Sequence, residues 1–299
     1  MGLLDKLVGN SQGGRKDEFV ELIRAVDNNE EWAVRRLQQM WKSNDPTLFA
    51  RMDKARLQIY ESAARQGDPI AQYWMGVSLR ETDMQASLNW LVPLANQGNI
   101  DAMVAIAEGY NNVGYGDDPI LYRQWYMKAA EAGDADAQAV IGREFFYQDN
   151  DNESAYEWFN KAAQQGNAKG YLGISKCLEE KRLQLFGDPA FSDLQVRQQE
   201  TRRLDDLIED AYIAAANSAK NNYEIEEAFG GLGRHYLHLL DSQGDDLDVA
   251  KRAAFFLYKS YLAGNKYSLE YFQDVVNKYK LDVDTSDINA WGKREGLYH

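Results

Sequence analysis

Small and apolar residues recur along this chain at fixed distances from a series of glycines. Two large residues stand eight and seven positions before each glycine, and a pair that is usually Ala-Ala stands four and three positions before it. An Asp or Asn follows directly, a small residue comes at plus four, and a large–small pair comes at plus eight and plus nine. The glycines of the clear copies, separated by 31, 35 and 33 residues, are Gly67, Gly98, Gly133 and Gly166. A weaker copy surrounds Gly264, and a period of this length is typical of helix-pair repeats.

The spacing within one copy predicts two helices, which we call helix B before the glycine and helix A after it. The large pair and the Ala pair lie three to four residues apart, so they share one stripe of helix B. Glycine ends helix B because it adopts the left-handed conformation at little cost. The Asp or Asn that follows predicts an N-cap for helix A, because its side chain can accept from the first free amides: Asp68, Asn99, Asp134, Asn167 and Asn265.

The copy at Gly133 is the best example of the pattern. It has Trp125-Tyr126, Ala129-Ala130, Ala137 and Ile141-Gly142 in the expected slots. This pattern resembles the Sel1-like repeat family, a variant of the tetratricopeptide helix pair, most closely over 59–175. The resemblance implies an all-α fold, a right-handed superhelical solenoid of antiparallel helix pairs, which such proteins normally use to bind other proteins.

We expect one solenoid of about six to seven repeats over 17–299, preceded by a flexible or capping leader at 1–16. A cryptic first copy is centred on Asn28. The period breaks after Cys177. We expect a long-helix insertion near 183–218, with a loop at 183–193 and one long charged helix at 194–216. The copy that follows is stretched: Ala219 stands in place of the glycine, and five extra residues within 220–227 bring Gly233 and Arg234 into the plus-nine and plus-ten slots of helix A. A helix pair follows at 247–279. The segment 286–298 predicts a terminal helix that covers the last repeat, because an uncapped solenoid end exposes its core.

Composition narrows the class of partner. The formal net charge of −14 argues against nucleic acid or an anionic membrane as the main partner. The stretch from Glu200 to Ala250 holds twelve Asp or Glu against four Lys or Arg, which indicates either a solvated surface or a docking face for a basic protein. One cysteine and no apolar run of 18 residues favour a cytoplasmic protein without a membrane span.

The residues that could carry chemistry form no recognisable constellation. His235 and His238 lie three positions apart on a predicted helix, but a zinc site needs three or four ligands and the remaining histidine is His299. We therefore interpret them as surface or interface histidines. Cys177 has no partner pattern for a nucleophile, and no glycine-rich phosphate loop occurs. We expect no metal, no cofactor and no enzymatic activity.

Candidate binding residues follow from the repeat template. If helix A lines the concave surface, then the slots at plus six, seven, ten and thirteen face inward. The aromatic and cationic residues in those slots are Tyr73, Trp74, Arg80, Arg143, Phe146, Lys176 and Arg234. Protein-binding hot spots are rich in such side chains. The alternative is that about half of them only complete the packing between repeats.

A second candidate surface is the acidic turn with Asp245, Asp246 and Asp248. The favoured function is a non-enzymatic adaptor that binds a protein or peptide on the concave face. The alternative is a cytoplasmic bacterial immunity protein that neutralises a basic toxin. An enzyme is the third class, and no group of residues supports it.

Overall fold

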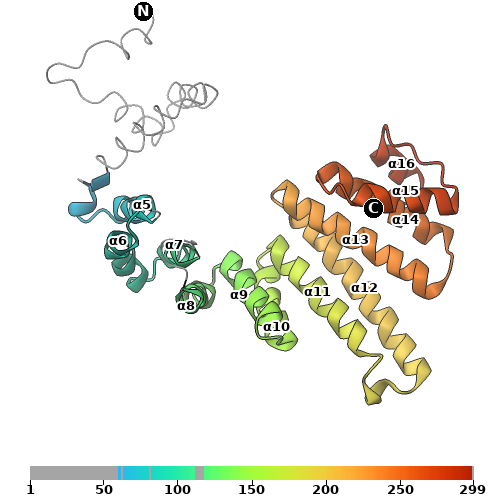
Figure 1. Ribbon diagram of the computed structural model, residues 1–299, viewed down its shortest axis with the longest axis horizontal. Coiled ribbons are helices and arrows are strands. Elements are labelled where there is room, and N and C mark those ends of the chain that lie inside the picture. The colour runs from blue at the N-terminus through green and yellow to red at the C-terminus, as the bar shows by residue number, and fades with distance from the viewer. Residues whose placement is uncertain (1–59, 62, 81, 112–117, 298–299) are drawn as a thin grey trace, which may run out of the picture. The chain divides into compact units, whose positions relative to one another are not determined.

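The computed structural model describes residues 60–297 apart from 62, 81 and 112–117 (Figure 1). The leader predicted at 1–16 and the cryptic copy around Asn28 lie outside these residues. Every regular element in the described part of the chain is a helix, and no strand occurs there. The all-α class expected from the sequence is therefore confirmed.

The described residues form two compact units that divide between Trp125 and Tyr126, inside α8 (Pro119–Glu131). Unit 1 contains α5 (Pro69–Leu79), α6 (Met84–Asn96) and α7 (Ile100–Tyr110). Unit 2 contains α9 (Ala135–Tyr147), α10 (Asn152–Gln164), α11 (Ala168–Gln184), the 3₁₀ helix η1 (Pro189–Phe191), α12 (Leu194–Ser218), α13 (Asn222–Gln243), α14 (Leu247–Ala263), α15 (Ser268–Tyr279) and α16 (Ile288–Arg294). In unit 2 each helix from α9 to α15 packs on the next, as expected for consecutive helix pairs.

The repeat glycines end their helices as the sequence predicts. All five have a positive φ, between +73° at Gly166 and +132° at Gly264. At each one, the amide of the next residue donates to a carbonyl five residues earlier, as Asp134 N does to Ala129 O at 3.0 Å. This is the Schellman arrangement, which satisfies the last carbonyls of helix B. The glycine slot is therefore fixed by backbone conformation.

The residues after these glycines cap helix A in four copies. Asp68, Asn99, Asp134 and Asn167 each accept a hydrogen bond from the amide three residues later, at 2.6 to 3.1 Å. The fifth prediction is wrong. Asn265 accepts from Tyr267 N at 3.2 Å, and α15 begins only at Ser268, with no side-chain cap.

The glycine at plus nine has a packing role that repeats along the chain. A Cβ on Gly142 would lie 2.8 Å from the ring of Phe159, which occupies the minus-seven slot of the next copy. Gly233 meets Leu257 in the same way at 2.7 Å, and Gly76 meets Leu91. The large side chain of each following helix B thus lies directly on the backbone of the preceding helix A. This contact explains why glycine recurs in a helix, where it costs about 1 kcal/mol relative to Ala.

Unit 2 departs from the repeat where the period breaks. The long helix predicted at 194–216 is α12, which has 25 residues, and its neighbours α11 and α13 have 17 and 22. The helices α5 to α10 have 11 or 13. The predicted terminal helix corresponds to α16, whose Trp291 is buried and stacks on Phe255 of α14. One core cluster runs from Ala155 to Leu297, so these longer helices extend the same core.

The close contact at plus nine leads to the first prediction. Gly142→Leu places a side chain into Phe159, and we expect a net loss of about 1–3 kcal/mol in the free energy of unfolding from overpacking. The matched control is Gly187→Leu. The nearest atom to a Cβ at Gly187 is Gln184 O at 3.9 Å, so this variant should stay within about 0.5 kcal/mol of wild type. Urea denaturation measures both, and equal losses would show that the plus-nine contact is not tight.

Candidate functional site

Three of the predicted binding residues occupy one slot on successive A helices of unit 2. Arg143 of α9 and Lys176 of α11 stand ten residues after their repeat glycines, and Arg234 of α13 stands in the equivalent slot of the stretched copy. Helix α11 contacts both α9 and α13. We define the A-helix face as these three cations together with Tyr147 and Glu227.

The contacts on the A-helix face join its members across the helices. Lys176 Nζ lies 3.9 Å from a carboxylate oxygen of Glu227 and 6.0 Å from the centre of the Tyr147 ring. Arg143 lies 4.0 Å from the carboxylate of its neighbour Glu144. The side chains of Arg143 and Lys176 are 54% and 38% exposed, and Arg234 is exposed. The face therefore presents three cationic groups to solvent.

The exposed aromatic ring of this face differs from the predicted one. Phe146 is half-buried against the core of unit 2, whereas Tyr147 is 57% exposed. The two rings meet edge to face at 4.9 Å. The sequence template did not include the slot at plus fourteen, which is why Tyr147 was missed.

The predicted residues of unit 1 form a separate group. Trp74 is 40% exposed and stacks on Tyr60 with ring centres 6.3 Å apart, while Tyr73 meets it edge to face. Burial raises the pKa of Tyr73, and the carboxylates of Asp101 and Glu108 raise it further, whereas Arg80 lowers it.

The Arg80 side chain forms an ion pair and a hydrogen bond within unit 1. Its guanidinium forms an ion pair with Glu108 and donates to Ala105 O at 3.5 Å, and its side chain is only 21% exposed. It therefore joins α5 to α7, which is the packing role that the sequence left open. Trp74 is the most accessible of the three predicted residues in this unit.

The carboxylates of the acidic turn mostly form hydrogen bonds and ion pairs within the protein. Asp246 caps α14 by accepting from Asp248 N and Val249 N at 2.8 and 3.2 Å. Asp245 accepts from the Tyr279 hydroxyl at 2.5 Å and lies 3.2 Å from Lys278, and these two bonds lower its pKa. Asp248, whose side chain is 87% exposed, lies 3.9 Å from Lys251. Two of the three carboxylates thus have a structural role.

A buried polar cluster between α11, α12 and α13 was not predicted from the sequence. Arg182 donates to Asp205 at 2.6 Å, and their side chains are only 8% and 6% exposed. His235, interpreted from the sequence as a surface or interface residue, is 2% exposed, so that interpretation is wrong. Neither ring nitrogen of His235 has a hydrogen-bond partner among the described residues. None of the three residues occupies a slot of the repeat template, so the template could not predict that they are buried.

The described residues contain few side chains that could bind a metal ion or carry out a covalent reaction. They contain no group of three or more His, Cys, Asp and Glu side chains that could hold a metal. Cys177 is buried, and burial raises the pKa of its thiol to about 12, so the thiolate is disfavoured at neutral pH. No helix among them is long and apolar enough to cross a bilayer.

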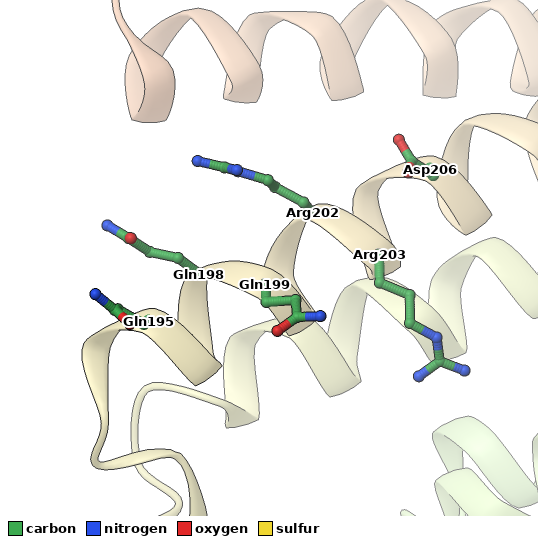
Figure 2. Close-up of a pocket in the computed structure, with 6 residues that line it drawn as sticks. All are labelled: Gln195, Gln198, Gln199, Arg202, Arg203 and Asp206. Atoms are coloured by element: carbon green, nitrogen blue, oxygen red, sulfur yellow. The ribbon is translucent and has the colours of Figure 1, made fainter.

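A hollow of about 430 Å³ lies along one side of α12. Figure 2 shows its lining: Gln195, Gln198, Gln199, Arg202, Arg203 and Asp206. Arg202 and Arg203 extend from the helix in opposite directions, so their guanidinium groups do not converge on one ligand (Figure 2). The hollow is an exposed strip of polar side chains.

The comparisons with known proteins identify the fold. No family model and no curated protein matches this chain. Among solved structures, it is similar to c5321, a protective antigen of uropathogenic Escherichia coli strains displaying an SLR fold, with a TM-score of 0.57 and 22% identity. That match covers 83% of this chain and 52% of the other, so this chain spans about half its length. A Sel1 repeat protein from Oxalobacter formigenes matches with a TM-score of 0.46, 21% identity, and coverage of 74% and 91%. The resemblance to Sel1-like repeats is confirmed at the level of the fold: the chain is an α-solenoid of the SLR type.

The buried ion pair gives the second prediction. Arg182→Met leaves the Asp205 carboxylate buried without its partner, and we expect a loss of about 3–5 kcal/mol in the free energy of unfolding. The double variant Arg182→Met/Asp205→Leu should lose less, because no buried charge remains. Arg203→Met is the matched control. The Arg203 side chain is 64% exposed beside Glu200, so that variant should cost less than about 1 kcal/mol. Chemical denaturation measures all three, and a double variant as unstable as the single one would contradict this account.

The buried histidine gives the third prediction. Burial, with the nearby charges of Arg182 and His238, lowers the pKa of His235 from 6.5 to about 4. Between these values the unfolded chain binds a proton that the folded chain does not, so stability falls as pH falls through this window. The difference corresponds to about 3 kcal/mol when the pH has reached 4. In His235→Gln the free energy of unfolding should depend less on pH between 6.5 and 4. Parallel profiles for wild type and variant would show that His235 is protonated equally in both states.

Proposed function

We propose that this chain is a non-enzymatic scaffold that binds a protein or peptide partner on the A-helix face. The observation that carries the proposal is the alignment of Arg143, Lys176 and Arg234 in one slot, beside the exposed ring of Tyr147. Cationic and aromatic side chains with solvent access are the types that dominate binding energy in protein interfaces.

The ion pairs of two of these cations, Arg143 and Lys176, contribute little to the stability of the fold. The ion pairs of Arg143 and Lys176 have N–O separations of 4.0 and 3.9 Å and are open to solvent. Exposed pairs of this kind contribute about 0–1 kcal/mol. Exchanging these two ion pairs for contacts with a partner therefore costs the fold little.

The placement of the reactive side chains supports a binding role over catalysis. Cys177 and His235, a thiol and an imidazole that an enzyme could use, are both buried in the core of unit 2. The likeness to an SLR fold agrees with this, because helix-pair solenoids present extended surfaces for binding.

The experiment that tests the function uses the full chain as bait in the source cell extract, followed by affinity measurements with the captured protein. We expect Arg143→Ala and Arg234→Ala each to weaken binding by about 2 kcal/mol, near thirtyfold, while the melting temperature stays close to wild type. The controls are Arg202→Ala and Arg203→Ala, exposed arginines on α12 and outside the A-helix face. A partner that binds all four variants as tightly as wild type would exclude this face.

A further inference from the structure

The cation row on the A-helix face is confined to three helices. The plus-ten slot holds Arg143, Lys176 and Arg234 in α9, α11 and α13. In the other copies with a described helix A the same slot holds no cation: it holds Val77, Glu108 and Asp274. A solenoid that only needed a polar residue at plus ten would accept either sign of charge there. Three cations in succession, in a chain of net charge −14, indicate a ligand with negative charge.

The two carboxylates that pair with the row are less exposed than their cations. The Glu144 side chain is 18% exposed against 54% for Arg143, and Glu227 is 28% exposed against 38% for Lys176. No carboxylate among the described residues is within ion-pair distance of Arg234. A ligand that approaches from solvent therefore has access to ammonium and guanidinium groups, and these can form shorter, charge-assisted hydrogen bonds with it.

The spacing between the three cations indicates which conformation of a peptide ligand fits the row. Packed helices lie about 8–10 Å apart, so the three plus-ten slots follow each other at roughly that interval. A polyproline II segment has three residues per turn and a rise of about 3.1 Å per residue, so residues three apart share one side at about 9 Å. Acidic residues at every third position of such a segment match the three cations. The ring of Tyr147, beside Lys176, offers an apolar surface to the residues between them.

The geometry points to an acidic peptide segment in extended, polyproline II-like conformation as the ligand of the A-helix face, with Asp or Glu at every third position. This inference rests on the proposed function and names its class of partner. A nucleic acid fits less well. Duplex DNA carries one charge per roughly 1.7 Å along its axis, and most of those charges would face an acidic protein instead of the three cations.

The test uses a fluorescently labelled peptide with three Glu residues separated by Pro-Pro, titrated with the full chain by fluorescence anisotropy. Peptides with Gln or Lys in place of Glu are the comparators. We expect the Glu peptide to bind at least tenfold more tightly than either. Arg143→Glu and Arg234→Glu should each weaken that binding at least tenfold, whereas Arg202→Glu on α12 should leave it unchanged. The double variant Arg143→Glu/Arg234→Glu should prefer the Lys peptide.

The outcomes separate this inference from the proposed function. If the Gln or Lys peptide, or a short single-stranded RNA, binds wild type best and the Arg143 and Arg234 variants weaken it, the face binds a partner but the acidic class is wrong. If Glu-peptide binding is unchanged by either reversal, the cation row is not its site. If neither a peptide nor the captured protein responds to any face variant, both proposals fail. Circular dichroism melting of each variant shows that a loss of binding is not a loss of fold.

Discussion

The contact between the glycine at plus nine and the large side chain at minus seven of the next copy sets the geometry of this protein. Where Phe159 lies against Gly142, its ring packs directly on the backbone of the preceding helix A. This contact also fixes the rotation of helix A. The next residue, at plus ten, is turned by about 100° from the packed glycine, which takes it off the buried stripe. Arg143 follows Gly142 and Arg234 follows Gly233, so the packing that builds the core also orients the cation row.

The repeat was predictable from the sequence because its constraints are local. A positive φ needs glycine, and the free amides of a new helix need a short polar side chain, so residues such as Gly133 and Asp134 carry the pattern directly. The last copy fails where that local chemistry changes. The chain makes an additional turn after Asn265, and α15 starts without a side-chain cap. A template built on spacing has no means to detect such a delay.

The buried polar cluster was not predictable, because it depends on contacts between distant residues. Arg182 and Asp205 are separated by 23 residues and belong to the lengthened helices that leave the repeat. His235 and His238 share a spacing that fits either a solvent face or a core face. Only the packing of α13 decides that His235 is buried and His238 half-buried. The same limit applies to the site: the template supplied Arg143, Lys176 and Arg234 but not Tyr147, whose ring the end of α9 leaves exposed.

Net charge and local charge lead to opposite expectations for the partner, and the distance over which charges act decides between them. The value of −14 by itself suggests a basic partner. At physiological ionic strength, however, exposed charges are screened beyond about 8 Å, so a bound ligand responds mainly to the groups within that distance. On the A-helix face those groups are exposed cations and less exposed carboxylates. On the acidic turn, Asp245 and Asp246 are already held by internal hydrogen bonds. The net charge therefore sets how fast a ligand arrives, whereas the local row determines which ligand stays bound.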